Sequence, residues 1–477
     1  MQTIKTDICI LGAGSGGLSI AAGAVQMGAR VVVVEGGEMG GDCLNAGCVP
    51  SKALIAAAKA AQAMRSGAAF GITAVEPKVD FGAVKDHVDR VIATIAPVDS
   101  QERFEGLGVR VIRTWGRFTA PNELEAGDFR IRARRFVIAT GSRPFVPPIP
   151  GIETVPYLTN ETIFALRIRP SHLIIIGGGP IGMEMAQAHR RLGSAVTVVE
   201  AAKAFGRDDP ELAAVVLEVL QEEGVAIIEG TPVVRVSAMQ AGDGSAGVEV
   251  VLGNGTVLTG SHLLMAVGRQ VVTEGLGLEA AGVAFTRKGI TVGPDLRSSN
   301  RRIYAVGDAA GGLQFTHVAG AHAGVVIRQI VFGLPAKTAT HAIPWATYTE
   351  PELAQVGLTE AEARARHGDG VTVVRAAFAH NDRALTERKA KGLAKVMVVK
   401  GRPVGASIAG PQAGELIALW ALAISSRLKM GNVAGMIAPY PTLGEVSKRA
   451  AGAYFSPRLF DNPVVKRVVG LVQRYLP

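Results

Sequence analysis

Two stretches of the chain share one order of apolar and polar positions. In each, an apolar strand leads into a glycine-rich turn, a helix follows, and a second apolar strand ends at a glutamate. The first stretch covers residues 7–35 and the second covers residues 173–200, with the glutamate at the same distance after the first glycine. This order predicts two strand–turn–helix–strand motifs of a doubly wound α/β fold.

Both turns carry the Gly-x-Gly-x-x-Gly spacing that suits a dinucleotide. The first glycine permits the tight turn, the second lets the backbone approach a pyrophosphate, and the third packs the helix on the strand. The helix N-terminus offers unsatisfied N–H groups and the positive end of a dipole to the phosphates. The glycines with these predicted roles are Gly12, Gly14, Gly17, Gly177, Gly179 and Gly182.

A glutamate ends each motif, at Glu35 and at Glu200. Its carboxylate is expected to accept hydrogen bonds from a ribose 2′-OH and to repel a 2′-phosphate, so Glu200 favours NAD, with NADP left open. The two complete motifs predict that the protein holds two dinucleotides. The alternative is a pair of tight strand-to-helix turns that bind no ligand.

Two cysteines lie close together just after the first motif. Cys43 and Cys48 stand at or near the N-terminal end of a helical pattern that runs from about Ser51 to Met64. A helix N-terminus stabilises a thiolate and lowers the pKa of the thiol. A zinc site needs about four ligands, but Cys9 lies on a different strand, as an expected small buried hydrophobe, and no histidine is near in the sequence. The pair therefore indicates a dithiol/disulfide couple, and no resident metal site is predicted.

Composition fits a globular protein of several domains. The chain has 477 residues, 48% of them apolar and 19% charged, and this length suggests about three domains. The net charge of +9 comes from scattered basic residues without a nucleic-acid recognition motif, so no nucleic-acid partner is predicted. No apolar run is long enough to span a bilayer, and the N-terminus leads straight into a strand rather than a signal peptide. A cytoplasmic protein is therefore expected.

The segment from Gly41 to Lys52 resembles the active-site helix of the class I FAD-dependent pyridine nucleotide–disulfide oxidoreductases. This family includes dihydrolipoyl dehydrogenase, glutathione reductase and mercuric reductase. The resemblance covers nearly the whole chain, and its further landmarks are Ala139-Thr140-Gly141, Ala266-Val267-Gly268-Arg269, Ala305-Val306-Gly307-Asp308, Tyr348-Thr349-Glu350-Pro351-Glu352 and Gly357-Leu358-Thr359-Glu360. One departure is Gln270-Val271-Val272, where the family usually has Pro-Asn after the Gly-Arg element.

The resemblance implies a homodimer of three-domain subunits. Two Rossmann-like domains are expected to bind FAD and NAD(P), and a C-terminal α+β dimerisation domain follows them. The FAD domain is expected to be discontinuous, with the NAD(P) domain inserted into it. The expected FAD, NAD(P), second FAD and dimerisation segments are, in that order, residues 1–150, 151–270, 271–340 and 341–477.

The resemblance also implies a route for electrons. In the family, hydride passes from the nicotinamide to the flavin, and the reduced flavin then opens the disulfide. Cys48 is the expected flavin-facing thiol, which forms a charge-transfer thiolate, and Cys43 is the expected interchange thiol that attacks the acceptor. Lys52 and Glu184 match an ion pair near flavin N5. Without the resemblance, Lys52, Glu184 and His317 would each be interpreted first as a solvated or capping residue. Further expected cofactor contacts come from Thr140, Gly141, Gly268, Asp308 and His317.

The acceptor side departs from the disulfide reductases. Their His-Pro-Thr-x-x-Glu segment supplies a His–Glu base from the partner subunit, whereas here Tyr440 takes the histidine position and Glu445 keeps the acid. A phenol with a pKa of about 10 is a poor base at neutral pH. A tyrosine at this place is similar to mercuric reductase, where it helps hold the metal, although that enzyme carries a C-terminal Cys-Cys and no cysteine follows Cys48 here. A packing role for Tyr440 at the dimer interface is the alternative.

The predicted function is the transfer of hydride from NAD(P)H through FAD to a redox-active Cys43–Cys48 disulfide. The expected acceptor is a small-molecule disulfide or a thiol-bound metal, as in mercuric reductase. The alternatives are a dihydrolipoyl dehydrogenase-like enzyme, an NADH-dependent flavoprotein that reduces quinone or oxygen, and a redox-sensing flavoprotein.

Residues 456–477 predict a basic amphipathic helix, with apolar positions from Val464 to Leu476 at helical spacing. Such a helix lies on an anionic membrane or packs against its own protein or its dimer partner. Packing is the favoured interpretation, and peripheral membrane contact is the alternative.

Overall fold

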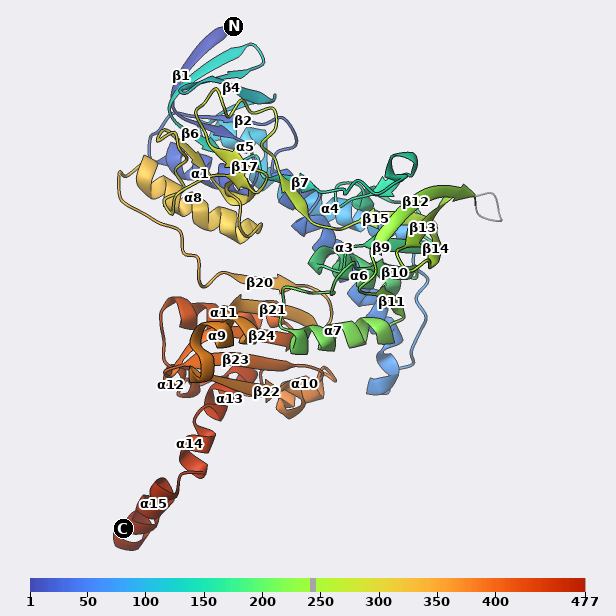
Figure 1. The fold of residues 1–477 in the computed structure, drawn as a ribbon, viewed down its shortest axis with the longest axis vertical. Helices are drawn as coiled ribbons and strands as arrows, with labels where there is room; N and C mark the ends of the chain where they lie inside the picture. The colour runs from blue at the N-terminus through green and yellow to red at the C-terminus, as the bar shows by residue number, and fades with distance from the viewer. Residues whose placement is uncertain (241–245, 477) are drawn as a thin grey trace. The chain divides into compact units, whose positions relative to one another are not determined.

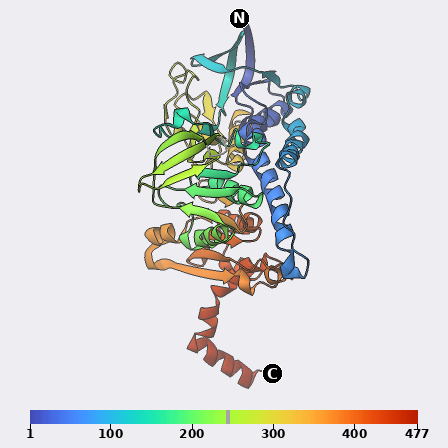
Figure 2. The ribbon, with the colours of Figure 1, turned by 90° about the vertical axis from the view of Figure 1, so that its right-hand side faces the viewer.

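The computed structural model describes residues 1–240 and 246–476 and shows a mixed α/β protein, as expected from the sequence (Figure 1, Figure 2). The chain divides into two compact units. The first unit contains Met1–Gly178, Ala188–Ala201 and Thr231–Thr338. The second unit contains Gly179–Gln187, Ala202–Gly230 and Ala339–Pro477.

A mainly parallel sheet in the first unit carries the first motif. Its strands run in the order β3-β2-β1-β6-β5-β4, and β19 also pairs with β6. The pairs among β1, β2, β3, β6 and β19 are parallel, and β4 and β5 add an antiparallel edge. The strands are β1 (Gln2–Leu11), β2 (Val31–Val34), β3 (Arg110–Ile112), β4 (Gly116–Ala120), β5 (Glu123–Ala126), β6 (Phe129–Ile138) and β19 (Ile303–Ala305).

Helices of the first unit cover this sheet and extend from it. All four valines of β2 are buried, as expected for a parallel strand with both faces covered. Cys9 of β1 is fully buried, which confirms its expected place in the core. The helices are α1 (Ser15–Gln26), α2 (Gly41–Asn45), α3 (Cys48–Arg65), α4 (Phe81–Asp99), α5 (Gln101–Gly106) and α8 (Thr316–Ile330).

A second parallel sheet carries the second motif. β9 pairs in parallel with β10 on one side and with β15 on the other, and β15 pairs in parallel with β8. A separate antiparallel sheet follows the order β12-β13-β14. The strands are β8 (Tyr157–Leu158), β9 (His172–Ile176), β10 (Ala195–Val199), β12 (Val233–Gln240), β13 (Ala246–Leu252), β14 (Val257–Gly260) and β15 (His262–Met265), and the motif's helix is α6 (Pro180–Arg191).

An antiparallel sheet of order β20-β21-β24-β23-β22 forms the centre of the second unit. Trp420 of α11 is fully buried in its core and donates a hydrogen bond from Nε1 to Ser447 Oγ at 3.1 Å. The strands are β20 (Pro344–Thr347), β21 (Glu352–Gly357), β22 (Val371–Ala377), β23 (Leu393–Val399) and β24 (Arg402–Gly410), with β11 (Val225–Ile228) in the same unit. The helices are α7 (Pro210–Glu222), α9 (Glu360–His367), α10 (Asp382–Thr386), α11 (Ala413–Ser425), α12 (Met430–Ala434) and α13 (Glu445–Ala453).

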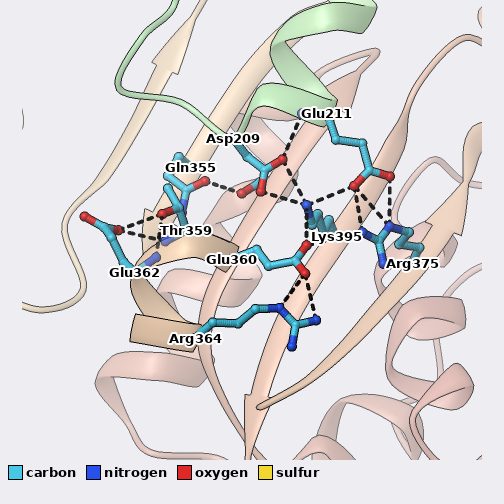
Figure 3. A network of polar contacts seen from close by, with 10 residues as sticks. Asp209, Glu211, Gln355, Thr359, Glu360, Glu362, Arg364, Arg375 and Lys395 are labelled. Carbon is cyan, nitrogen blue, oxygen red and sulfur yellow. Dashed lines mark hydrogen bonds and ion pairs between the residues drawn. The ribbon is translucent and has the colours of Figure 1, made fainter. Parts of the chain in front are cut away.

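A buried lysine joins α7 to this sheet (Figure 3). The Lys395 side chain is 4% exposed, and its Nζ lies 2.8 Å from Asp209 Oδ2, 2.9 Å from Glu211 Oε2 and 2.7 Å from Glu360 Oε2. Arg375 bridges the same two glutamates from β22. Asp209 also caps α7, because its carboxylate accepts a hydrogen bond from the backbone N–H of Glu211. This set of paired charges, the Lys395 cluster, offsets the cost of burying the ammonium group.

Two short helices end the second unit. α14 (Ser456–Phe460) follows α13, and α15 (Pro463–Tyr475) follows α14, so the helix predicted near Val464–Leu476 is confirmed. Packing against its own unit is not observed, since none of the residues of α15, all of which the structure describes, is buried. Among the described residues, no helix has the length and apolar character needed to cross a bilayer.

Candidate active site

The two cysteines of the predicted couple lie in adjacent helices of the first unit. Cys43 lies within α2, and Cys48 is the first residue of α3, so the predicted position at a helix N-terminus is found. Both are free thiols, Cys43 half-buried and Cys48 exposed. A hydrogen bond from Cys43, one from Thr316 at 3.5 Å and the charge of Lys52 lower the pKa of Cys48 to about 6, against the opposing effect of burial. The hydrogen bond to Cys48 and the burial of the thiol raise the pKa of Cys43.

This difference in pKa assigns the two sulfurs different forms at neutral pH. Cys48 carries the thiolate, and Cys43 keeps its proton and donates it in a hydrogen bond. A thiolate stabilised at a helix N-terminus, beside a lysine and a threonine hydroxyl, is the arrangement that a redox-active dithiol needs.

A polar chain connects the dithiol helix to Asp308. Asp42, next to Cys43 in the sequence, accepts from the Arg269 guanidinium at 3.1 Å. Arg269 Nε donates to Ser142 Oγ at 2.7 Å, and Ser142 Oγ donates to Asp308 Oδ2 at 2.6 Å. Burial raises the pKa of Asp308. These polar contacts therefore connect Asp308, an expected cofactor residue, to the segment that holds the cysteines.

The sequence did not predict this series of polar contacts between Asp42 and Asp308. Arg269 was visible only as a landmark of the resemblance, and Asn160 and Ser142 gave no signal at all. Asn160 donates from Nδ2 to Asp42 Oδ1 and to the Ala46 carbonyl, both at 3.0 Å, and so fixes the loop between the cysteines. The pairing of β7 (Ser142–Pro144) with β16 (Arg269–Val271) brings Ser142 near Arg269 across the sequence.

Only glycine fits at the start of each predicted nucleotide turn. Gly12 has a φ of +105°, and a Cβ there would lie 2.3 Å from the Ala139 carbonyl oxygen. Gly177 has a φ of +114°, and its Cβ would lie 2.3 Å from the Ala266 carbonyl oxygen. The two positions have the same backbone conformation and the same close neighbour, a carbonyl of the adjacent strand end. Both motifs therefore fold the same turn.

The two closing glutamates also make the same contact. Glu35 Oε2 accepts from the backbone N–H of Ala13 at 2.6 Å, and Glu200 Oε2 accepts from the backbone N–H of Gly178 at 2.7 Å. Each acid is thus held directly beside the glycine turn of its own motif, where a ribose hydroxyl of a bound dinucleotide can reach it.

Both turns fit a dinucleotide. A Cβ at Gly179 would meet nothing within 4 Å, and one at Gly14 would meet only the Gly41 Cα at 4.0 Å. This open space beside the backbone is what a pyrophosphate requires, and a side chain would fill it. Gly17 and Gly182 stand at the third glycine position of the two turns; a Cβ at Gly17 would lie 2.0 Å from the Gly12 carbonyl oxygen.

Of the other expected cofactor residues of the first unit, Thr140, Gly141 and Gly268 lie on loops, and His317 lies in a helix. Thr140 Oγ1 donates to the Val272 carbonyl at 3.0 Å. Gly141 and Gly268 have φ values of +67° and +117°, which glycine adopts readily. His317 lies in the first turn of α8, next to the Thr316 that contacts Cys48, and its exposed ring stacks on Phe315 at 5.2 Å.

Lys52 and Glu184 fall in different compact units, so their expected ion pair stays a prediction. Lys52 lies one helical turn after Cys48 in α3, with Nζ 3.4 Å from Ser51 Oγ. Glu184 of α6 is buried, and its Oε1 accepts from the backbone N–H of Tyr348 at 2.9 Å within the second unit.

Tyr440 of the second unit points its hydroxyl at a carboxylate. Its Oη donates to Asp382 Oδ2 at 2.9 Å, and 69% of the residue is exposed. The hydrogen bond and the charge of Asp382 raise the pKa of Tyr440. Glu445 accepts from the backbone N–H of Thr442 at 3.5 Å. The phenol therefore stays protonated at neutral pH and supplies no base.

Comparison with known proteins identifies both parts of the chain. Residues 6–323 match the profile described as pyridine nucleotide-disulphide oxidoreductase. Residues 343–451 match the profile of the dimerisation domain of the same proteins.

Relatives of known name match along nearly the full length. A mercuric reductase of Streptomyces lividans is 34% identical over 468 residues, covering 94% of this chain and 96% of the relative. A dihydrolipoyl dehydrogenase of Thermus scotoductus is 36% identical over 463 residues, covering 94% and 97%. Among solved structures, the Cu(II) complex of the HOCl-induced flavoprotein disulfide reductase RclA from Escherichia coli has a TM-score of 0.84 at 28% identity, covering 94% and 99%.

Proposed function

Since the chain belongs to the pyridine nucleotide-disulphide oxidoreductase family, whose members are flavoproteins that use FAD and NAD(P)H, we propose that it reduces a Cys43–Cys48 disulfide with hydride from NADH. NADH and one proton convert the disulfide into two thiols. Reoxidation of the thiols then delivers two electrons to a thiol-bound metal or a small-molecule disulfide.

The unequal pair of sulfurs is the observation that carries this proposal. Bound FAD would supply the two-electron relay between the nicotinamide and the sulfur pair. Thr316 and Lys52 stabilise the thiolate of Cys48, and Cys43 retains its proton until it attacks the acceptor. The glycine turns at Gly12 and Gly177, each with its glutamate, would hold the two dinucleotides.

The bond between Tyr440 and Asp382 supports a thiol-bound metal as the acceptor. Thiol exchange with a small disulfide needs a group that moves protons near neutral pH, as an acid when the disulfide is reduced and as a base when the dithiol is oxidised. The Tyr440 phenol, whose pKa the Asp382 carboxylate raises further, is a poor group for either step. A metal bound by two thiolates needs electrons but no such base. The similarity to mercuric reductases points in the same direction.

A quinone or oxygen is the second candidate acceptor, because the same lack of a base favours any oxidant that accepts electrons without thiol exchange. A dihydrolipoyl dehydrogenase-like activity has the support of a 36% identical relative but faces the same obstacle at Tyr440.

The proposal also includes the assembly of the protein, its domains and its cellular location. The match to a dimerisation domain supports a homodimer. We keep the four domain segments 1–150, 151–270, 271–340 and 341–477, and a cytoplasmic location, as predictions. NAD is the proposed nucleotide, on the grounds of the Glu200 carboxylate beside the second turn.

A panel of acceptors tests the proposal. The kcat/KM for NADH oxidation is measured with mercuric ion in excess thiol, lipoamide, glutathione disulfide, a quinone and oxygen. Mercuric ion is expected to give the highest value, with lipoamide near background. Tyr440→His is expected to raise lipoamide turnover, while Tyr440→Phe, which keeps the ring but offers no base, leaves it at background. High lipoamide turnover in the unaltered enzyme would refute the metal as preferred acceptor.

A further inference from the structure

The chain continues beyond the family's dimerisation domain into a helix that its own unit leaves uncovered. The domain match ends at residue 451, and α15 begins at Pro463. Figure 1 and Figure 2 both show α14 and α15 leading away from α13 and from the sheet of the same unit. None of the residues to which the dithiol chemistry above assigns a role lies in this segment.

The residues of α15 separate completely into two faces. At about 100° per residue, the apolar side chains occupy an arc of about 160°, and the polar ones occupy the opposite side. The apolar face consists of Val464, Val465, Val468, Val469, Leu471, Val472 and Tyr475. The opposite, polar face consists of Lys466, Arg467, Gln473 and Arg474, together with Pro463 and Gly470.

The apolar face is exposed along its length except at Val465, which is half-buried. Val464 is 62% exposed, Leu471 57% and Tyr475 70%. Phe460 and Leu459 of α14, just before the helix, are exposed as well. A contiguous apolar face of this kind on a protein surface marks a place where something binds.

We propose that α15 lies flat on an anionic lipid surface, with its apolar face in the headgroup region. The polar face carries Lys466, Arg467 and Arg474 and no acid, which complements anionic phospholipid. A helix of 13 residues is about 20 Å long, whereas the hydrocarbon core is about 30 Å thick, so it rests on the membrane and does not span it. Tyr475 brings an aromatic ring with a polar tip, which suits the interface.

Charge argues against a second copy of α15 as the occupant of this face. Two such helices packed apolar face to apolar face would bring the flanking cations Lys466 and Arg467 of each copy near those of the other, with no acid in the helix to pair with them. The apolar arc is also wider than the narrow stripe through which a helix pair packs. A lipid surface has neither disadvantage.

Vesicle sedimentation of the full-length FAD-loaded protein tests the proposal. Vesicles of phosphatidylcholine with about one third phosphatidylglycerol are compared with vesicles of phosphatidylcholine alone. The protein is expected to bind the anionic vesicles at least about tenfold more tightly, and to leave them as salt is added. Lys466→Gln/Arg467→Gln/Arg474→Gln is expected to weaken binding about a hundredfold, at about fivefold for each cation.

Two further variants separate the apolar face from the rest of the helix. Val468→Glu/Leu471→Glu is expected to abolish vesicle binding, whereas Gln473→Ala on the polar face leaves it unchanged. NADH oxidation and the oligomeric state are expected to stay the same in all variants. The proposal fails if the protein does not sediment with vesicles or binds both kinds equally. It also fails if Val468→Glu/Leu471→Glu changes the oligomeric state, since the face would then be a subunit interface.

Discussion

The two strand–turn–helix–strand motifs fold the same turn but continue into different chemistry. Gly12 and Gly177 share a positive φ and a close carbonyl neighbour, and Glu35 and Glu200 accept from equivalent backbone N–H groups. After Glu35 the chain enters α2 and α3, which carry the dithiol. After Glu200 it enters α7, whose cap Asp209 belongs to the Lys395 cluster.

On the proposed function, the turn would supply nucleotide binding and the segment after it would supply the specific task. A dinucleotide-binding site needs only backbone N–H groups, open space and a carboxylate, so the same turn can occur in both motifs. A redox centre needs two thiols with unequal pKa values, which only the first continuation provides.

Removal of the sulfurs gives the largest expected effect. Cys43→Ser or Cys48→Ser should lower turnover with a thiol-dependent acceptor by about a thousandfold or more, because no disulfide can form. FAD content and NADH binding, measured by absorbance and by fluorescence quenching, should stay the same, since neither cysteine lies in a nucleotide turn. Cys9→Ser serves as the control for loss of a thiol elsewhere. Turnover that survives in both variants would show that the couple is not on the electron path.

Equivalent glycine substitutions separate the two motifs. Gly12→Ala should yield protein without FAD, and Gly177→Ala should retain FAD but raise the KM for NADH by at least about tenfold, because each Cβ would clash with a carbonyl. Gly179→Ala, with open space around its Cβ, should leave folding intact and affect only the nucleotide. Equal loss of FAD in Gly12→Ala and Gly177→Ala would contradict the assignment of one nucleotide to each motif.

Substitutions in and beside the Lys395 cluster test the segment that follows the second motif. Lys395→Met leaves three carboxylates without their buried partner and should lower the free energy of unfolding by about 3–5 kcal/mol, measured by urea denaturation. Arg364→Met, which breaks an exposed pair with Glu360, is the matched control, with a change within about 0.5 kcal/mol. Similar effects of the two substitutions would mean that burial of Lys395 contributes nothing.

The smallest expected effect is a shift in the pH at which Cys48 of the reduced enzyme loses its proton. The lowered pKa of Cys48 means that the thiolate is present above about pH 6 and is lost as the pH falls through that value. Long-wavelength absorbance of the two-electron-reduced enzyme should follow this titration. Thr316→Val removes a hydrogen bond to the thiolate and should move the midpoint to higher pH. A midpoint that Thr316→Val leaves in place would show that the hydroxyl does not stabilise the thiolate.

Local pattern allowed the motifs, the cysteine pair and the C-terminal helix to be predicted. The glycine turns depend on backbone conformation, which a few neighbouring residues specify, and the faces of α15 follow from helical spacing alone. The predicted helix near Ser51–Met64 was located correctly, although α3 begins earlier, at Cys48.

The sequence did not predict contacts between residues that lie far apart along the chain. The chain from Asp42 through Arg269 and Ser142 to Asp308 joins four separate segments, and its existence depends on the pairing of β7 with β16. Nothing in the sequence marks Lys395 of β23. Its three acids come from two helices that pack on the sheet: Asp209 and Glu211 from α7 and its cap, and Glu360 from α9. Tertiary structure, not local preference, decides such sites.

Anaerobic titration of the FAD-loaded enzyme with NADH tests the electron path most directly. One equivalent of NADH should produce long-wavelength absorbance from the Cys48 thiolate beside oxidised flavin, together with two titratable thiols that the oxidised enzyme lacks. Bleaching of the flavin at one equivalent, with no long-wavelength absorbance and no new thiols, would contradict the path.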